Sequence, residues 1–161
     1  MNKFWLIVVF SFFCFNSYSQ NAINVVKIEE LKKVYSNADD TTYVINFFAT
    51  WCGPCVMEIP ILNKFYEEHK NTNVKLIFVS LDNASYLKKL PQKLKKWNIQ
   101  APVYLLNESS DYSWLPLIDK RWQGSIPATM VVNQKRNVKA FFETPLEKGQ
   151  LEYYLQKLGL K

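Results

Sequence analysis

The sequence VINFFATWCGPCVMEIP, residues 44–60, decides the fold of this chain. It opens with an apolar run of strand length and continues into a helical pattern that extends from Gly53 to about His69. Cys52 and Cys55 lie at this junction, so the first helical turn places both thiols close enough to form a small-ring disulfide. Cys52 falls at the helix N-terminus, where unpaired backbone N–H groups and the helix dipole favour a thiolate. Cys55 lies one turn further in, and we expect it to be more buried and protonated.

This asymmetry predicts thiol–disulfide exchange. Cys52 attacks a disulfide sulfur of a partner and forms a mixed disulfide, which Cys55 then displaces. In the oxidising direction a substrate thiolate attacks the Cys52–Cys55 bond instead. A structural bridge is the weaker interpretation because so short a loop gains little loop-closure entropy. A zinc site would need ligands that a chain with a single histidine lacks, so we expect no metal and no other cofactor.

The remaining sequence, 161 residues in all, predicts one α/β domain with a mixed central sheet covered by helices on both faces. Three apolar segments and a hairpin predict the strands, and amphipathic patterns predict the helices. The last helix is expected to begin at the capping box Thr144-Pro145-Leu146-Glu147. The expected strands are residues 43–48, 74–81, 102–106, 129–133 and 138–142, and the expected helices are residues 28–35, 53–69 (interrupted by Pro60), 86–97 and 112–122.

Residues 1–19 have the pattern of a secretory signal peptide, a basic start followed by a short apolar run and small residues at alternate positions. Cleavage is expected between Ser19 and Gln20, which leaves residues 20–161 as the domain. An uncleaved leader would instead tether the protein to the membrane. Either way the expected location is periplasmic or otherwise extracytoplasmic, where disulfides persist. Removal of the leader also removes Cys14, so Cys52 and Cys55 are the only cysteines of the mature chain.

Residues 44–60 resemble the active site of the thioredoxin superfamily, and Glu58 and Pro60 resemble its exported TlpA/ResA-like branch in particular. The resemblance extends over about residues 22–160, and Asn83–Leu106 matches the mid-chain insertion of that branch. It implies a thioredoxin fold and an enzyme that exchanges thiols and disulfides, commonly by reducing protein disulfides outside the cytoplasm.

Further site residues follow from this resemblance. Ser125-Ile126-Pro127-Ala128 matches the loop in which the proline is cis and faces the dithiol. The backbone of Ile126 would pair with an extended substrate, and Pro127, Trp51, Gly53 and Pro54 would complete the substrate-binding surface.

Two polar positions differ in what they imply. Cytoplasmic thioredoxins carry a buried Asp six residues before the first Cys, where this chain has Asn46, which cannot act as a carboxylate base. Glu58 lies on the same helical face as Cys55. We expect Glu58 to accept or supply the proton of the buried thiol and to raise the thiol pKa values.

The direction of the reaction is expected to be reducing. Gly53 and Pro54 add no cation to stabilise the thiolate, which favours a Cys52 pKa near about 7 and a potential nearer about −270 than −120 mV. Such a reductant needs an electron donor, for which a membrane thiol relay is expected. Apocytochrome c maturation and repair of misoxidised proteins are the implied substrate classes. The alternatives are a disulfide oxidase or isomerase and a non-catalytic binding module.

The net charge of +6 is concentrated in LKKLPQKLKKW, residues 87–97, which holds five lysines. Their grouping around Leu87, Leu90 and Leu94 predicts a helix with one buried stripe and a solvated basic face, and no nucleic-acid partner is expected. We expect a monomer in which His69 lies at the surface, and Trp114 and Trp122 pack beside the site.

Overall fold

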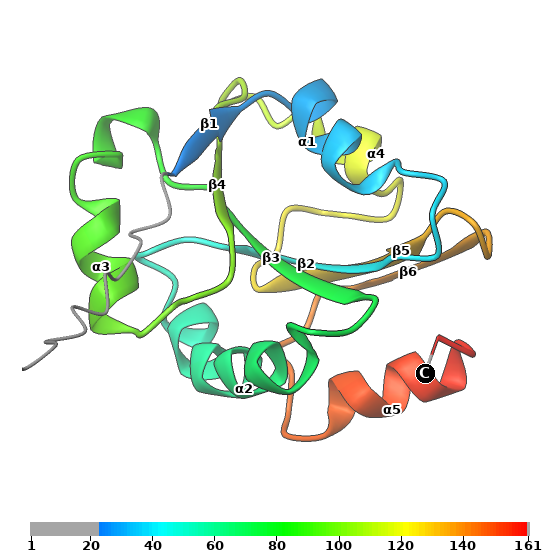
Figure 1. Ribbon diagram of the computed structural model, residues 1–161. Coiled ribbons are helices and arrows are strands. Elements are labelled where there is room, and N and C mark those ends of the chain that lie inside the picture. Colours follow the sequence, from blue (N-terminus) through cyan, green and yellow to red (C-terminus); the bar gives the residue numbers. More distant parts are fainter. Residues whose placement is uncertain (1–22, 161) are drawn as a thin grey trace, which may run out of the picture.

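The computed structural model describes residues 23–160, so the expected leader lies outside the described residues. A mixed sheet with the strand order β1-β4-β3-β2-β5-β6 forms its centre (Figure 1). The first four strands in this order are parallel, and β5 and β6 are antiparallel to their neighbours. The strands are β1 Asn24–Val26, β2 Thr42–Phe48, β3 Val74–Ser80, β4 Val103–Leu106, β5 Ala128–Asn133 and β6 Val138–Phe142.

Helices cover both faces of this sheet, as predicted. Figure 1 shows α1 and α4 on one face and α2 and α5 on the other, with α3 near the side of the sheet that β1 and β4 form. The helices are α1 Ile28–Tyr35, α2 Gly53–His69, α3 Leu90–Lys96, α4 Leu115–Ile118 and α5 Gln150–Lys157, and a 3-10 turn, η1, spans Ala84–Tyr86. Helix α2 continues through Pro60 without a break.

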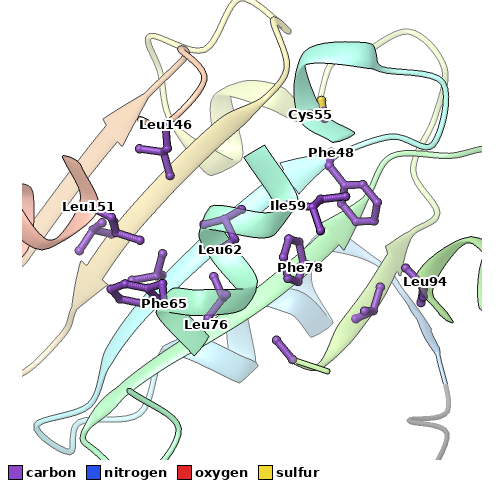
Figure 2. Close-up of a cluster of buried hydrophobic side chains, with 14 of the residues drawn as sticks. Phe48, Cys55, Ile59, Leu62, Phe65, Leu76, Phe78, Leu94, Leu146 and Leu151 are labelled. Carbon is purple, nitrogen blue, oxygen red and sulfur yellow. The ribbon is translucent and has the colours of Figure 1, made fainter. Parts of the chain in front are cut away.

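Alternation along β2 explains how the sheet is buried on both faces. Val44 and Phe48 pack in the core under α2, whereas Ile45 and Phe47 pack in the core under α1 and α4. Cys55 lies at one end of the α2 core, beside Phe48 and Ile59 (Figure 2). The dithiol is therefore anchored in the largest apolar cluster of the described chain.

Two of the predicted helices are much shorter than expected. Residues 86–97 form α3 only from Leu90, because Pro91 falls in its first turn, where the missing backbone N–H costs nothing. Its leucines 90 and 94 are buried and Lys88, Lys89, Lys95 and Lys96 are exposed, which confirms the buried stripe. Residues 112–122 are helical only in α4, since Tyr112 adopts a positive φ of 58°.

The predicted capping box at Thr144 is wrong. Helix α5 begins at Gln150, and the Glu147 backbone N–H, which a capping box would direct to the Thr144 hydroxyl, donates to the Gln150 side chain instead. The prediction that His69 is a surface residue is also wrong. Its side chain is buried and stacks on Phe65 with 4.1 Å between the ring centroids. Strand β1, which pairs with β4, was not predicted because it has only three residues.

Candidate active site

The two cysteines form a disulfide at the start of α2, with 5.3 Å between their Cα atoms. Cys52 is the N-cap residue of α2, and its sulfur accepts a hydrogen bond from the Cys55 backbone N–H at 3.2 Å. The positive end of the helix dipole and the Cys55 backbone N–H thus both point at the Cys52 sulfur, and each of them stabilises a thiolate.

The neighbours of the disulfide differ sharply in exposure. Cys55 is fully buried and Cys52 is 6% exposed, whereas the Trp51 side chain is 72% exposed. Gly53 and Pro54 are also exposed. Met57, which the sequence analysis did not single out, adds a second exposed apolar side chain one turn along α2. A partner protein can therefore reach the Cys52 side of the disulfide, while the Cys55 sulfur faces the core.

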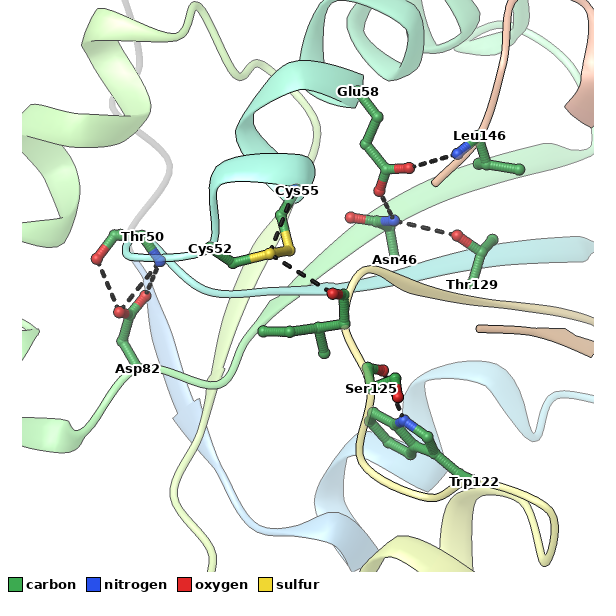
Figure 3. The surroundings of a disulfide bond; sticks show 11 residues. Asn46, Thr50, Cys52, Cys55, Glu58, Asp82, Trp122, Ser125, Thr129 and Leu146 are labelled. Carbon is green, nitrogen blue, oxygen red and sulfur yellow. Dashed lines mark hydrogen bonds between the residues drawn. A yellow bond between two sulfur atoms is a disulfide. The ribbon is translucent and has the colours of Figure 1, made fainter. Parts of the chain in front are cut away.

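The loop before β5 faces the disulfide, and its Ile126–Pro127 peptide bond is cis, as predicted. The Ile126 carbonyl oxygen lies 3.7 Å from the Cys52 sulfur (Figure 3). In the disulfide this sulfur carries no proton, so the approach is a contact and becomes a possible hydrogen bond only in the thiol form. The Trp122 indole N–H donates to the Ser125 carbonyl at 3.0 Å and supports the loop from beneath.

Both predicted tryptophans are buried. Trp114 and Trp122 contact each other edge to face, with 5.6 Å between their ring centroids. Trp122 also packs against Phe47 of β2. These contacts confirm the packing role predicted for the pair.

Glu58 is buried in α2, three residues after Cys55, and both oxygens of its carboxyl group accept hydrogen bonds. One oxygen accepts from the Asn46 side-chain amide and the other from the Leu146 backbone N–H, each at 2.7 Å. Burial raises the pKa of the Glu58 carboxyl, and these two hydrogen bonds offset only part of that rise. Asn46 stands in β2 where cytoplasmic thioredoxins have a buried Asp. In this chain the buried carboxyl group beside that position comes from Glu58 of α2.

Asp82 is a site residue that the sequence analysis missed. Its buried carboxylate accepts from the Thr50 backbone N–H at 3.0 and 3.1 Å and from the Thr50 hydroxyl (Figure 3). It also accepts from the Ser80 hydroxyl. Asp82 follows β3 and Thr50 follows β2, and the carboxyl ends of neighbouring parallel strands meet at one edge of a sheet. An acidic residue just after the second predicted strand was the available signal.

Within residues 23–160, no group of three His, Cys, Asp or Glu side chains is arranged to hold a metal ion. Over the same range, no helix has the length and apolar character needed to span a membrane.

Comparison with known proteins identifies the class. The Redoxin family model matches residues 22–156, and the chain belongs to this family. A thioredoxin-related protein from Neisseria meningitidis serogroup B has a similar structure, with a TM-score of 0.65 and 21% identity over 76% of this chain and 88% of that one. The thioredoxin fold predicted from residues 44–60 is therefore confirmed.

Among curated relatives, the thiol-disulfide oxidoreductase ResA of Oceanobacillus iheyensis is 25% identical over 140 residues, which cover 81% of this chain and 69% of that protein. The sporulation thiol-disulfide oxidoreductase A of Bacillus subtilis is 24% identical over 115 residues, covering 71% of this chain and 66% of that protein. The chain thus spans about two thirds of the length of these relatives. The resemblance to the ResA-like branch is confirmed.

Proposed function

We propose that this protein is an exported thiol–disulfide oxidoreductase that reduces disulfides of other proteins through Cys52 and Cys55. The observation that carries the proposal is the position of Cys52 as the N-cap residue of α2, with its sulfur accepting the Cys55 N–H. The similarity to proteins named thiol-disulfide oxidoreductases supports the same reaction.

The reaction begins from the reduced pair. The Cys52 thiolate attacks one sulfur of the substrate disulfide, and the other substrate sulfur leaves and takes a proton. Cys55 then attacks the Cys52 sulfur of the mixed disulfide, loses its own proton and releases the second substrate thiol. The burial of Cys55 keeps this second thiol away from unrelated disulfides until a substrate is bound.

The substrate is expected to bind on the protein surface next to Cys52. An extended segment would pair with the backbone of Ile126, next to Pro127, and lie against the exposed surface of Trp51, Gly53 and Pro54. The proximity of the Ile126 carbonyl to the Cys52 sulfur supports this placement, because a strand paired there would carry its own sulfur to Cys52.

Glu58 is assigned to proton handling at the buried thiol. Its raised pKa supports this role, since a carboxyl group that retains its proton nearer to neutral pH is a better proton donor at that pH.

We also propose that residues 1–19 are a signal segment and that residues 20–161 form the domain. The protein would then be located outside the cytoplasm as a monomer and would receive electrons from a membrane thiol donor. Apocytochrome c is one substrate class that fits this setting.

Two activity assays test the function. The reduced protein should accelerate insulin reduction by dithiothreitol and should be a poor catalyst of the reactivation of scrambled ribonuclease. The Cys52→Ser variant should show neither activity. Efficient ribonuclease reactivation without insulin reduction would indicate an isomerase, and insulin reduction by Cys52→Ser would refute the assigned nucleophile.

The raised pKa of Glu58 predicts how stability depends on pH. The folded protein holds the Glu58 proton more tightly than the unfolded chain, whose carboxyl titrates near 4.5. The stabilisation from Glu58 is therefore complete below that pH and is lost as the pH rises through the folded-state pKa. Glu58→Gln lacks this loss, so its free energy of unfolding should fall less than that of the wild type as the pH rises from 4.5 towards neutrality. Urea unfolding of the oxidised proteins across this range measures the difference.

The control for this experiment is Glu147→Gln, because Glu147 is an exposed side chain. Its stability profile should follow that of the wild type. Identical pH profiles for Glu58→Gln and the wild type would contradict a raised pKa for Glu58.

A further inference from the structure

The side-chain carbonyl of Asn46 has no hydrogen-bond partner among residues 23–160, although the residue is completely buried. Its amide nitrogen donates to Glu58 at 2.7 Å and to the Thr129 hydroxyl at 3.1 Å. In this arrangement the Glu58 oxygen and the Thr129 hydroxyl oxygen both accept from the amide nitrogen, so the amide oxygen points away from both groups. This orientation leaves a buried acceptor unsatisfied, which costs about 1–3 kcal/mol and is rare in folded proteins.

The position of this oxygen suggests its partner. Asn46 lies between Val44 and Phe48 in β2, on the face that α2 covers, and Cys55 and Glu58 are both buried on the facing side of α2. In Figure 3 the amide nitrogen of Asn46 points to Glu58 and its oxygen points to the side of Cys55. The unsatisfied acceptor thus lies on the side of Cys55, whose sulfur carries no proton in the disulfide.

We propose that Asn46 accepts a hydrogen bond from the Cys55 thiol when the protein is reduced. This inference rests on the proposed function, because it concerns the reduced state of the same pair. When a donor dithiol reduces the disulfide, two electrons and two protons pass to the protein, and one proton remains on Cys55 in a site closed to water. On reoxidation the Cys55–Cys52 bond forms, the bond from Cys52 to the substrate sulfur breaks, and the Cys55 proton ends on the departing thiol.

Asn46 is then a positioning residue, and Glu58, besides its proposed part in proton handling, holds Asn46 in place. One oxygen of the Glu58 carboxyl accepts from the Asn46 amide nitrogen, which turns the Asn46 oxygen towards the thiol. A hydrogen bond to the neutral thiol favours that form, so it keeps Cys55 protonated while Cys52 ionises. The same bond exists only in the reduced protein, so it shifts the redox equilibrium towards the dithiol.

A vibrational measurement tests the bond directly. Cys14→Ser and Cys52→Ala leave Cys55 as the single thiol of the chain. The infrared S–H stretch of this protein should have the lowered frequency of a hydrogen-bonded thiol, and adding Asn46→Leu should move it to the frequency of a free thiol. Thr129→Val, which removes the other acceptor of the Asn46 amide, should leave the band in place. A band that Asn46→Leu does not move would overturn the proposal, and Asn46→Ala serves if the leucine variant does not fold.

The redox equilibrium gives an independent readout. With both cysteines intact, Asn46→Leu should shift the equilibrium with glutathione towards the disulfide by roughly threefold to tenfold, the effect of one neutral hydrogen bond. Thr129→Val should shift it by much less. An unshifted equilibrium in Asn46→Leu would contradict the proposal while leaving the exchange reaction intact, whereas a wild-type protein that does not equilibrate with glutathione would refute the proposed function itself.

Discussion

Replacing Cys55 with serine is expected to trap the protein on its substrates. Cys52 of this variant can still attack a disulfide, but no second thiol is present to displace the substrate, so a mixed disulfide accumulates. Turnover in the insulin assay should fall to the background set by free dithiothreitol. Non-reducing electrophoresis after incubation with cell-envelope proteins should show covalent complexes, and dithiothreitol should separate them by reducing the mixed disulfide. Recovery of an apocytochrome would identify the substrate class.

The matched control for trapping is Cys52→Ser, in which the buried Cys55 is the remaining thiol of the pair. Because Cys55 is fully buried, this variant should form almost no complexes. Comparable complexes from both variants would mean that the two sulfurs are equally accessible, which contradicts the assigned roles.

Replacing Asp82 with alanine is expected to weaken both the fold and the reaction. The change leaves the half-buried Thr50 amide and hydroxyl and the buried Ser80 hydroxyl without their acceptor, and a buried donor left unsatisfied costs about 1–3 kcal/mol. Thr50 lies two residues before Cys52, so the loop that sets the Cys52 position also loses its attachment to β3. Urea unfolding should show a loss of about 3 kcal/mol, and the rate of insulin reduction should drop roughly tenfold or more, as expected when a reacting group is misplaced.

Asp111 offers a close control because its carboxylate also accepts hydrogen bonds from two neighbouring residues, Ser109 and Ser113, but on an exposed loop. Asp111→Ala should change stability and activity little. Asp82→Asn, which keeps an acceptor for Thr50, should recover most of the reduction rate. If Asp82→Ala reacts and unfolds like the wild type, the loop does not depend on this carboxylate.

Residues 44–60 predicted the fold and the position of the disulfide, and together with residues 125–128 they predicted the cis peptide bond at Pro127, because these features depend on local pattern and on the family resemblance. What the sequence could not supply was the pairing of polar groups from distant segments. The sequence interpretation treated Asn46 only as the loss of a carboxylate, but its amide donates to Glu58 of α2, and the Leu146 backbone N–H donates to the other Glu58 oxygen. The helix expected at Thr144 is absent because the Glu147 N–H donates to the Gln150 side chain and not to Thr144.

His69 illustrates a second limit. Its position at the end of an acidic helix indicated the surface, yet stacking on Phe65 and the contact of its ring nitrogen with the Phe65 carbonyl at 2.9 Å place it in the core. Helical spacing alone does not distinguish a polar residue at the edge of the buried face from one in solvent.

The central claim is that the Cys52 sulfur ionises more easily than the Cys55 sulfur, and the pH dependence of alkylation tests it most directly. The reduced protein is treated briefly with iodoacetamide at a series of pH values, and peptide mapping measures modification at each cysteine. The account predicts that Cys52 is modified first and with a midpoint near about 7, whereas Cys55 reacts slowly until the pH is much higher. Equal, slow modification of both cysteines across the series would contradict it.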